Sequence, residues 1–204
     1  MKLCVSMVVL ACFCCAAFAA TAGDDAAKIQ KAYENIKDIK GDFIQKSYIR
    51  ELKKTYTYRG QFFIKPPKMK WEFKGDKPQT VYITGEEVFI FQPREKQAIN
   101  TKFDRDTYGR APIALLGGFG DMNKEFYVSG KEGRLILKPR NPMGAITGIE
   151  LTISDGDFPI EAITVRDTVS NKIDITLKDV RINSGLADKI FNFTPPEGVT
   201  VLHQ

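Results

Sequence analysis

Residues 60–74 read GQFFIKPPKMKWEFK, and this segment sets the expectation for the whole fold. On both sides of Pro66 and Pro67 apolar and polar residues alternate, which is the period of a β-strand with one buried face. Two adjacent prolines cannot join a central sheet ladder, so two strands meet at a corner there. One face of this strand pair is apolar and the other is charged. The apolar face comprises Tyr56, Tyr58, Phe62, Ile64, Met69, Trp71 and Phe73.

The first residues have the features of an export signal. Met1 and Lys2 precede an uncharged apolar run over residues 3–20, and Ala17-Phe18-Ala19 has the small-x-small form of a signal peptidase site. We therefore expect a signal peptide at residues 1–19, with Ala22 as the alternative cleavage point. Residues 20–204 then form a single domain.

All four cysteines, Cys4, Cys12, Cys14 and Cys15, lie in this leader. Cleavage would leave none, which excludes disulfides, thiolate metal sites and cysteine nucleophiles from the mature domain. One alternative stays open. Residues 9–12 (VLAC) loosely resemble a lipoprotein processing box, and cleavage there would leave a lipidated Cys12 at the N-terminus.

The charge pattern argues against a nucleic-acid partner. The chain has 27% charged residues and a net charge of +5 at pH 7, with its lysines spread along the predicted strands. Lys70 and Lys74 alternate with Trp71 and Phe73, so cations and aromatic rings face opposite sides of the sheet. A single-strand nucleic-acid platform needs both on one surface.

The rest of the chain predicts one helix followed by many strands. Apolar residues at spacings of three and four predict an amphipathic helix over residues 24–40. Short helical turns are expected at residues 112–116 and 186–190. Runs with strand period cover residues 43–49, 55–65, 68–74, 80–84, 88–92, 96–103, 126–129, 134–138, 145–154, 160–167 and 172–182. Short turns between so many strands predict an antiparallel meander.

A long meander of this kind curls toward a barrel, and few helices are available to cover it. The aromatic residues of the apolar face could simply fill a core, which is what periodicity alone favours. An incompletely filled barrel would instead leave a cavity.

Groups suited to acid–base or nucleophilic catalysis are scarce. The only histidine, His203, lies beside the last residue, where order is least expected. Two carboxylate pairs, Asp104 with Asp106 and Asp155 with Asp157, fit turns better than a catalytic or metal site. We predict no enzyme activity, no catalytic residues, no cofactor and no metal.

Several motifs resemble one known family when they are taken in order. An exported chain opens with an amphipathic helix, and Gly41-Asp42-Phe43-Ile44-Gln45 follows it. Next come residues 60–73 with their proline corner, and then Gly85 before an aromatic strand that ends at Pro93. Pro112-Ile113-Ala114-Leu115-Leu116 lies mid-chain, and residues 191–199 read FNFTPPEGV. This ordered set resembles the periplasmic outer-membrane lipoprotein carrier family, LolA, over nearly the whole mature chain.

The resemblance implies a mainly β (α+β) fold, an incomplete antiparallel β-barrel with a helical lid over a hydrophobic cavity. It implies a periplasmic carrier, or chaperone, that binds the acyl chains of lipoproteins and moves them from the inner to the outer membrane. An inner-membrane lipoprotein-releasing ABC transporter and an outer-membrane lipoprotein receptor are the implied partners, and a monomer is expected. The expected cavity wall is Tyr58, Phe62, Trp71, Phe73, Val81, Ile83 and Phe91, and the expected lid residues are Ile29, Tyr33, Ile36, Leu115 and Leu116.

The chain departs from the family pattern at one position. Family members commonly have Lys-Arg-Pro where this chain has Lys65-Pro66-Pro67, and the arginine is thought to latch the lid by hydrogen bonds. Pro66 has no donor, although Lys65 or Lys68 could reach the lid. Two rival functions are a membrane-anchored lipoprotein receptor or other lipid-binding lipoprotein of the same fold, and an envelope scaffold or assembly protein.

Overall fold

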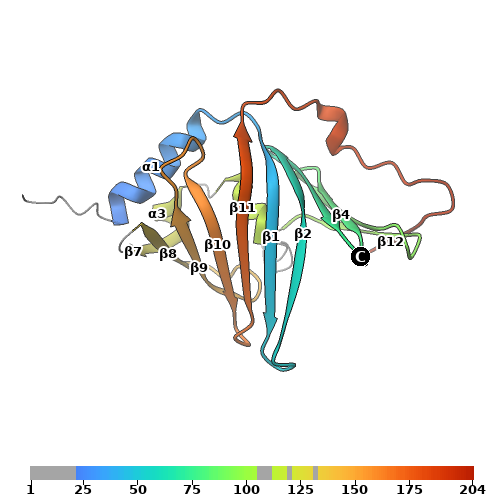
Figure 1. The fold of residues 1–204 in the computed structure, drawn as a ribbon, viewed down its shortest axis with the longest axis horizontal. Coiled ribbons are helices and arrows are strands. Elements are labelled where there is room, and N and C mark those ends of the chain that lie inside the picture. Colours follow the sequence, from blue (N-terminus) through green and yellow to red (C-terminus); the bar gives the residue numbers. More distant parts are fainter. Residues whose placement is uncertain (1–21, 105–111, 119–120, 131–132) are drawn as a thin grey trace, which may run out of the picture.

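The computed structural model describes residues 22–104, 112–118, 121–130 and 133–204. These residues form one open, strongly curved sheet of 12 strands in the order β12-β6-β5-β4-β3-β2-β1-β11-β10-β9-β8-β7 (Figure 1). Of these strands, only β12 and β6 pair in parallel. The strands are β1 (Ile39–Ile49), β2 (Lys54–Lys65), β3 (Lys68–Lys74), β4 (Gln79–Ile83), β5 (Glu87–Gln92), β6 (Gln97–Lys102), β7 (Phe126–Gly130), β8 (Arg134–Pro139), β9 (Ile146–Ile153), β10 (Ile160–Asp167), β11 (Lys172–Ile182) and β12 (Thr200–His203). The predicted fold class is confirmed.

The strands form two meanders and not one continuous series. β1 to β6 follow one another on one side, β7 to β11 on the other, and the long strands β1 and β11 join them. β7 therefore lies at the opposite edge of the sheet from β6 and β12. The connection between β6 and β7 contains η1 (Pro112–Gly117) and α3 (Met122–Glu125).

The N-terminal helix is shorter than predicted. α1 spans Ala22–Glu34, and Ile39 and Gly41 already belong to β1. Apolar residues three apart suit a helix turn, but Ile39 pairs with Ile64 on one side and Ile182 on the other. These ladder contacts outweigh the local pattern.

The concave face of the sheet holds an aromatic cluster, defined as Phe43, Phe62, Trp71 and Phe73. The Trp71 ring stacks on Phe43 with 4.0 Å between centroids, and Phe62 tilts against it at 5.3 Å. Gly60 makes room for this arrangement. A Cβ there would lie 1.7 Å from the Glu72 carbonyl oxygen and 2.7 Å from Cε1 of Phe43.

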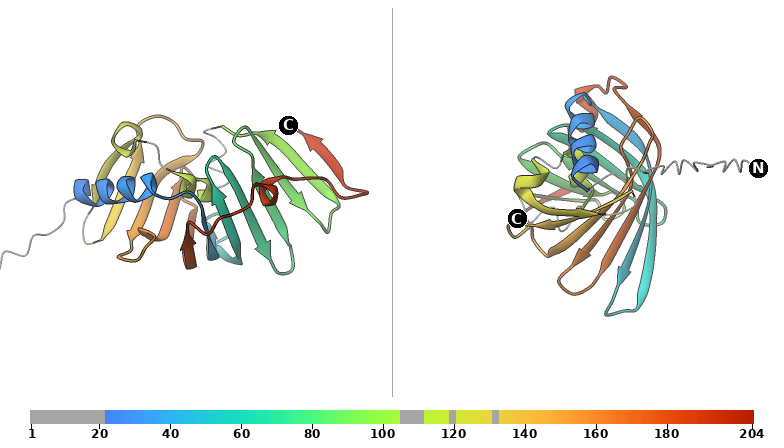
Figure 2. Two further views of the ribbon diagram at one scale, coloured as in Figure 1. Left: turned by 90° about the horizontal axis from the view of Figure 1, so that it is seen from above. Right: turned by 90° about the vertical axis from the view of Figure 1, so that its left-hand side faces the viewer.

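Helical segments cover part of the concave face (Figure 2). α1 contacts β7 and β8, whereas η1 contacts β2 and β3. Leu115 and Leu116 of η1 are buried, as are Ala26 and Ile29 of α1. No helix in the described ranges is long and apolar enough to cross a membrane.

The C-terminal segment crosses the convex face. η2 (Asp188–Phe191) contacts β3, and Phe193 lies on the rings of Tyr82, Phe89 and Phe91 at 5.3 to 5.4 Å. The chain then adds β12 at the edge of β6. His203 is thus the last residue of a strand, and the expectation that it lies in a poorly ordered end is wrong, because the parallel ladder with β6 holds it.

Candidate binding cavity

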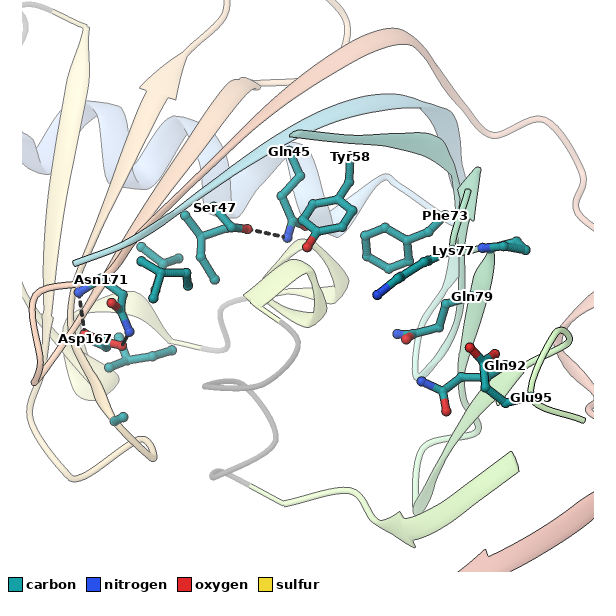
Figure 3. Close-up of a pocket in the computed structure, with 16 residues that line it drawn as sticks. Gln45, Ser47, Tyr58, Phe73, Lys77, Gln79, Gln92, Glu95, Asp167 and Asn171 are labelled. Carbon is teal, nitrogen blue, oxygen red and sulfur yellow. Dashed lines mark hydrogen bonds between the residues drawn. The ribbon is translucent and has the colours of Figure 1, made fainter. Parts of the chain in front are cut away.

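A cavity of about 640 Å³ opens on the concave side of the sheet, beyond the part that η1 covers (Figure 3). It runs from the β10–β11 turn, across β1 and β2, to the ends of β3, β4 and β5. The lining residues are Gln45, Ser47, Ile49, Tyr58, Phe73, Lys77, Pro78, Gln79, Gln92, Glu95, Ala145, Ile146, Val165, Asp167, Asn171 and Ile173.

One end of the cavity is polar and internally bonded. The Gln45 amide nitrogen donates to Ser47 Oγ at 3.0 Å. In the β10–β11 turn, Asp167 accepts hydrogen bonds from both the backbone and the side chain of Asn171, at 2.8 and 2.9 Å. The hydrogen-bonding groups of these side chains pair with one another, so this rim forms in the absence of a bound ligand.

The middle of the cavity is aromatic and connects with the buried cluster. Tyr58 packs edge-on against Phe73 at 5.9 Å, and Phe73 packs edge-on against Phe43 at 5.3 Å. Tyr58 is 37% exposed, while Trp71 behind it is only 3% exposed. The cavity wall is therefore continuous with the aromatic cluster under the lid.

The seven residues expected in the cavity wall fall into three groups. Tyr58 and Phe73 line the cavity. Phe62, Trp71, Val81 and Ile83 share the concave face but are buried in the core beside it. Phe91 faces the other way, because it lies opposite Thr80 in the ladder and its ring contacts Phe193 on the convex side. Its placement in the wall is corrected accordingly.

Two of the expected lid residues are linked by a hydrogen bond from a hydroxyl group. Tyr33 of α1 donates a hydrogen bond to the Leu116 carbonyl oxygen of η1 at 3.1 Å, and its ring lies edge-on to Phe158 at 6.0 Å. Burial raises the pKa of the Tyr33 phenol far above its usual value, so the hydroxyl stays protonated and can donate. Ile29 and Leu115 are buried, and Ile36 lies beyond the helix end, partly buried against the core.

Lys65 and Lys68 do not reach the lid. Both point to the convex side, where Lys65 Nζ lies 3.1 Å from Asp188 Oδ1 and also donates to the Leu186 carbonyl, and Lys68 Nζ lies 3.8 Å from Asp188. The hydrogen bond and charge of Lys65, with the charge of Lys68, hold the pKa of Asp188 below its usual value. These lysines fasten η2, so the expected lysine substitute for an arginine latch is not formed.

Asp38 anchors the junction between α1, β1 and the C-terminal segment. Its carboxylate accepts hydrogen bonds from Ser184 (backbone N–H and Oγ–H) and from the Gly185 and Leu186 amides, at 2.7 to 3.2 Å. Burial opposes ionisation of Asp38, but these hydrogen bonds outweigh it and lower its pKa. One carboxylate thereby fixes both the lid-side linker and the start of the convex-face segment.

Sequence reasoning missed the polar part of the site. Gln45 and Ser47 follow Phe43 at alternate positions, and Gln79 precedes Val81 in the same way, so the period already placed these side chains on the concave face. Alternation alone does not distinguish a polar side chain that lines a cavity from one at an exposed strand end. The described residues include no group of three or more His, Cys, Asp or Glu side chains placed to bind a metal.

Comparison with known proteins supplies the context for this geometry. The family model described as "Outer membrane lipoprotein carrier protein LolA" matches residues 34–194. An outer-membrane lipoprotein carrier protein of Bordetella avium is 30% identical over 168 residues, which are 79% of each chain. One from Dechloromonas aromatica is 29% identical over 175 residues, 83% of each chain. An uncharacterized conserved protein of Thermus thermophilus, 11% identical, matches in fold with a TM-score of 0.57 over 90% of this chain and 99% of that one.

Proposed function

This chain belongs to the LolA family of outer membrane lipoprotein carrier proteins, and from that premise we propose that it shelters the acyl chains of lipoproteins and carries them through the periplasm to the outer membrane. The observation that carries this proposal is the cavity of about 640 Å³ that continues into the aromatic cluster. That volume lies in the range of roughly 300–1,000 Å³ typical of small-molecule pockets.

Acyl chains need such a shelter in water. Burying each methylene gains about 0.8 kcal/mol, so one long chain represents on the order of 10 kcal/mol. Aromatic and aliphatic walls supply this energy without fixed hydrogen bonds, which suits cargo that must later be released. A polar rim at Gln45, Ser47, Asp167 and Asn171 suits the polar end of the same cargo.

We propose that the buried residues Phe62, Trp71, Val81 and Ile83 join the cavity when the lid shifts. They lie on the same face as Tyr58 and Phe73, and η1 lies over the strands that carry two of them. A shift that separates η1 from α1 would break the bond between Tyr33 and Leu116, since it joins the two. A sealed core would have favoured a scaffold protein, whereas this cavity supports a carrier.

The partners follow from the same proposal. Cargo would be loaded by a lipoprotein-releasing ABC transporter of the inner membrane and delivered to a lipoprotein receptor at the outer membrane.

Spheroplasts or inner-membrane vesicles that contain newly made lipoproteins test the proposal. We expect the purified protein to bring lipoproteins into the soluble fraction as a complex that co-purifies with it. A control variant, Leu202→Ser on the edge strand β12, should bring as much lipoprotein into the soluble fraction as wild type does. If wild type leaves all lipoproteins on the membrane under conditions where a related carrier releases them, the carrier function is wrong.

A further inference from the structure

The tips of two neighbouring hairpins form one projecting surface, which we call the tip surface: residues 50–54 at the turn from β1 to β2, and residues 168–171 between β10 and β11. The two tips are joined, because the Arg50 amide donates to Asn171 Oδ1 at 2.9 Å and Arg50 Nη1 to Ser170 Oγ at 3.4 Å. They extend to the same end of the molecule, opposite the end where α1 leads into β1 (Figure 1).

Each tip presents one apolar side chain to solvent. Leu52 is 55% exposed and Val169 is 60% exposed. A surface leucine alone needs no explanation, but two apolar residues at the ends of linked hairpins form a single projecting apolar edge. Backbone hydrogen bonds within each turn, Lys53 to Arg50 at 3.1 Å and Ser170 to Asp167 at 3.1 Å, hold them in place.

Cations lie in the first tip and along the strand that leads to it. Residues 46–54 contain Lys46, Arg50, Lys53 and Lys54 against a single carboxylate, Glu51. All four cations are exposed, and within the part of the chain that the structure describes none of them forms an ion pair. Their charge is therefore available to a partner. On the adjacent hairpin, Lys172 is instead paired with Asp174 at 2.7 Å.

The same tips bound the mouth of the cavity. Ser47 and Ile49 lie just before the first tip, Asp167 immediately precedes the second and Asn171 ends it, and all four line the cavity. Whatever the tips rest on therefore lies next to the opening through which a ligand would pass.

We propose that the tip surface docks this protein on an anionic membrane surface, with Leu52 and Val169 entering the lipid interface and Arg50, Lys53 and Lys54 binding lipid phosphates. Two small apolar residues give shallow, reversible insertion, and the cations supply attraction that salt weakens. This docking goes beyond the carrier function and does not depend on it. It would hold the cavity mouth against the bilayer.

Vesicle sedimentation with the exported form of the protein tests this docking. We expect binding to vesicles of 70% phosphatidylcholine and 30% phosphatidylglycerol at low salt, much weaker binding to pure phosphatidylcholine, and loss of binding in 0.5 M NaCl. Lys53→Gln/Lys54→Gln should bind on the order of 25-fold more weakly, since each cation contributes about fivefold. Leu52→Ser/Val169→Ser should lose about tenfold or more.

Two control variants carry the same types of substitution as the tip variants and have the same N-terminus, but their substitutions lie away from the tips. Leu202→Ser removes a leucine that is 43% exposed on β12, and Lys138→Gln removes an exposed cation on β8; both should bind like wild type. A fluorophore attached through Leu52→Cys should shift to shorter wavelength when vesicles are added. Equal binding by wild type and the two tip variants, or no binding to anionic vesicles, would overturn the proposal. Because no cargo is present, failure here leaves the carrier assay unaffected.

Discussion

The concave face has two halves that the same strands build. The sealed half is the buried part around Phe43, Phe62, Trp71 and Val81, and the open half is the cavity lining around Gln45, Ser47, Tyr58 and Gln79. In β1 the inward residues change from Phe43 to Gln45 and Ser47, and in β2 from Phe62 to Tyr58. In β4 they change from Val81 to Gln79. The inward residues of each strand are thus most apolar in the buried core and more polar where the cavity opens. The difference shows that one alternating pattern can supply a tight core at one end and a binding surface at the other.

Replacing Trp71, at the centre of the sealed half, should have the largest effect on stability. Trp71→Ala leaves a void among Phe43, Phe62 and Phe73, and we expect the free energy of unfolding to fall by about 4 kcal/mol. Urea unfolding followed by circular dichroism measures it. A loss below about 1 kcal/mol would mean that Trp71 is not a core residue, and the division into two halves would be wrong.

Forcing the sealed strands apart should be nearly as damaging. A Cβ at Gly60 overlaps the Glu72 carbonyl oxygen, so Gly60→Ala must separate β2 from β3, and we expect a loss of about 3 kcal/mol. Gly148→Ala in β9 is the matched control, because a Cβ there meets nothing within 4 Å. Equal thermal midpoints for the two variants would contradict the close approach at Gly60.

The stability that Asp38 contributes at the junction of α1, β1 and the C-terminal segment should be lost in acid. At pH 7, Asp38→Asn should lower the free energy of unfolding by about 2 kcal/mol, because four N–H and O–H groups lose their carboxylate partner. The pKa of Asp38 is lower in the folded than in the unfolded chain. Its contribution is therefore complete above about pH 4 and is lost as the pH falls through the folded-state value. Urea midpoints of wild type and variant should converge toward pH 2; a constant difference would exclude this role.

Loss of the hydrogen bond that joins α1 to η1 should have a smaller, local effect on stability. Tyr33→Phe removes the donor to Leu116, and we expect about 1 kcal/mol less protection of the Gly118 amide, which is bonded to the Leu115 carbonyl at 3.2 Å. Hydrogen exchange at that amide measures this directly. Because the raised pKa of Tyr33 keeps its hydroxyl protonated, the difference between wild type and variant should stay constant from pH 6 to 9. Unchanged protection would mean that packing alone holds η1.

The sequence was sufficient for the fold class and most of the strands, but not for the order of the strands in the sheet or for the site. Period-2 runs placed nearly all the strands and assigned Phe62, Trp71 and Phe73 to one face. They could not show that the sheet restarts at the far edge with β7, because pairing between distant segments is not encoded in local period. Nor could they show how deeply η1 covers Trp71 compared with Tyr58, since both have the same alternation. The sequence did not place Phe91 correctly, because residues 88–91 are apolar on both faces of the strand. The second apolar face is explained by the contact of Phe91 with Phe193 on the convex side.

A change in the open half should barely affect stability while it weakens binding. Tyr58 is 37% exposed and contacts Phe73 only by its edge, so Tyr58→Ser should lower the free energy of unfolding by no more than about 0.5 kcal/mol. If the cavity is the entry to the acyl site, the same variant should bind a fluorescent fatty-acyl probe several-fold more weakly. Tyr127→Ser, on the opposite part of the sheet and 58% exposed, is the matched control. If probe binding survives Tyr58→Ser but is lost in a folded lid variant, the cargo binds wholly in the sealed half. The open half would then be only the entrance to that site.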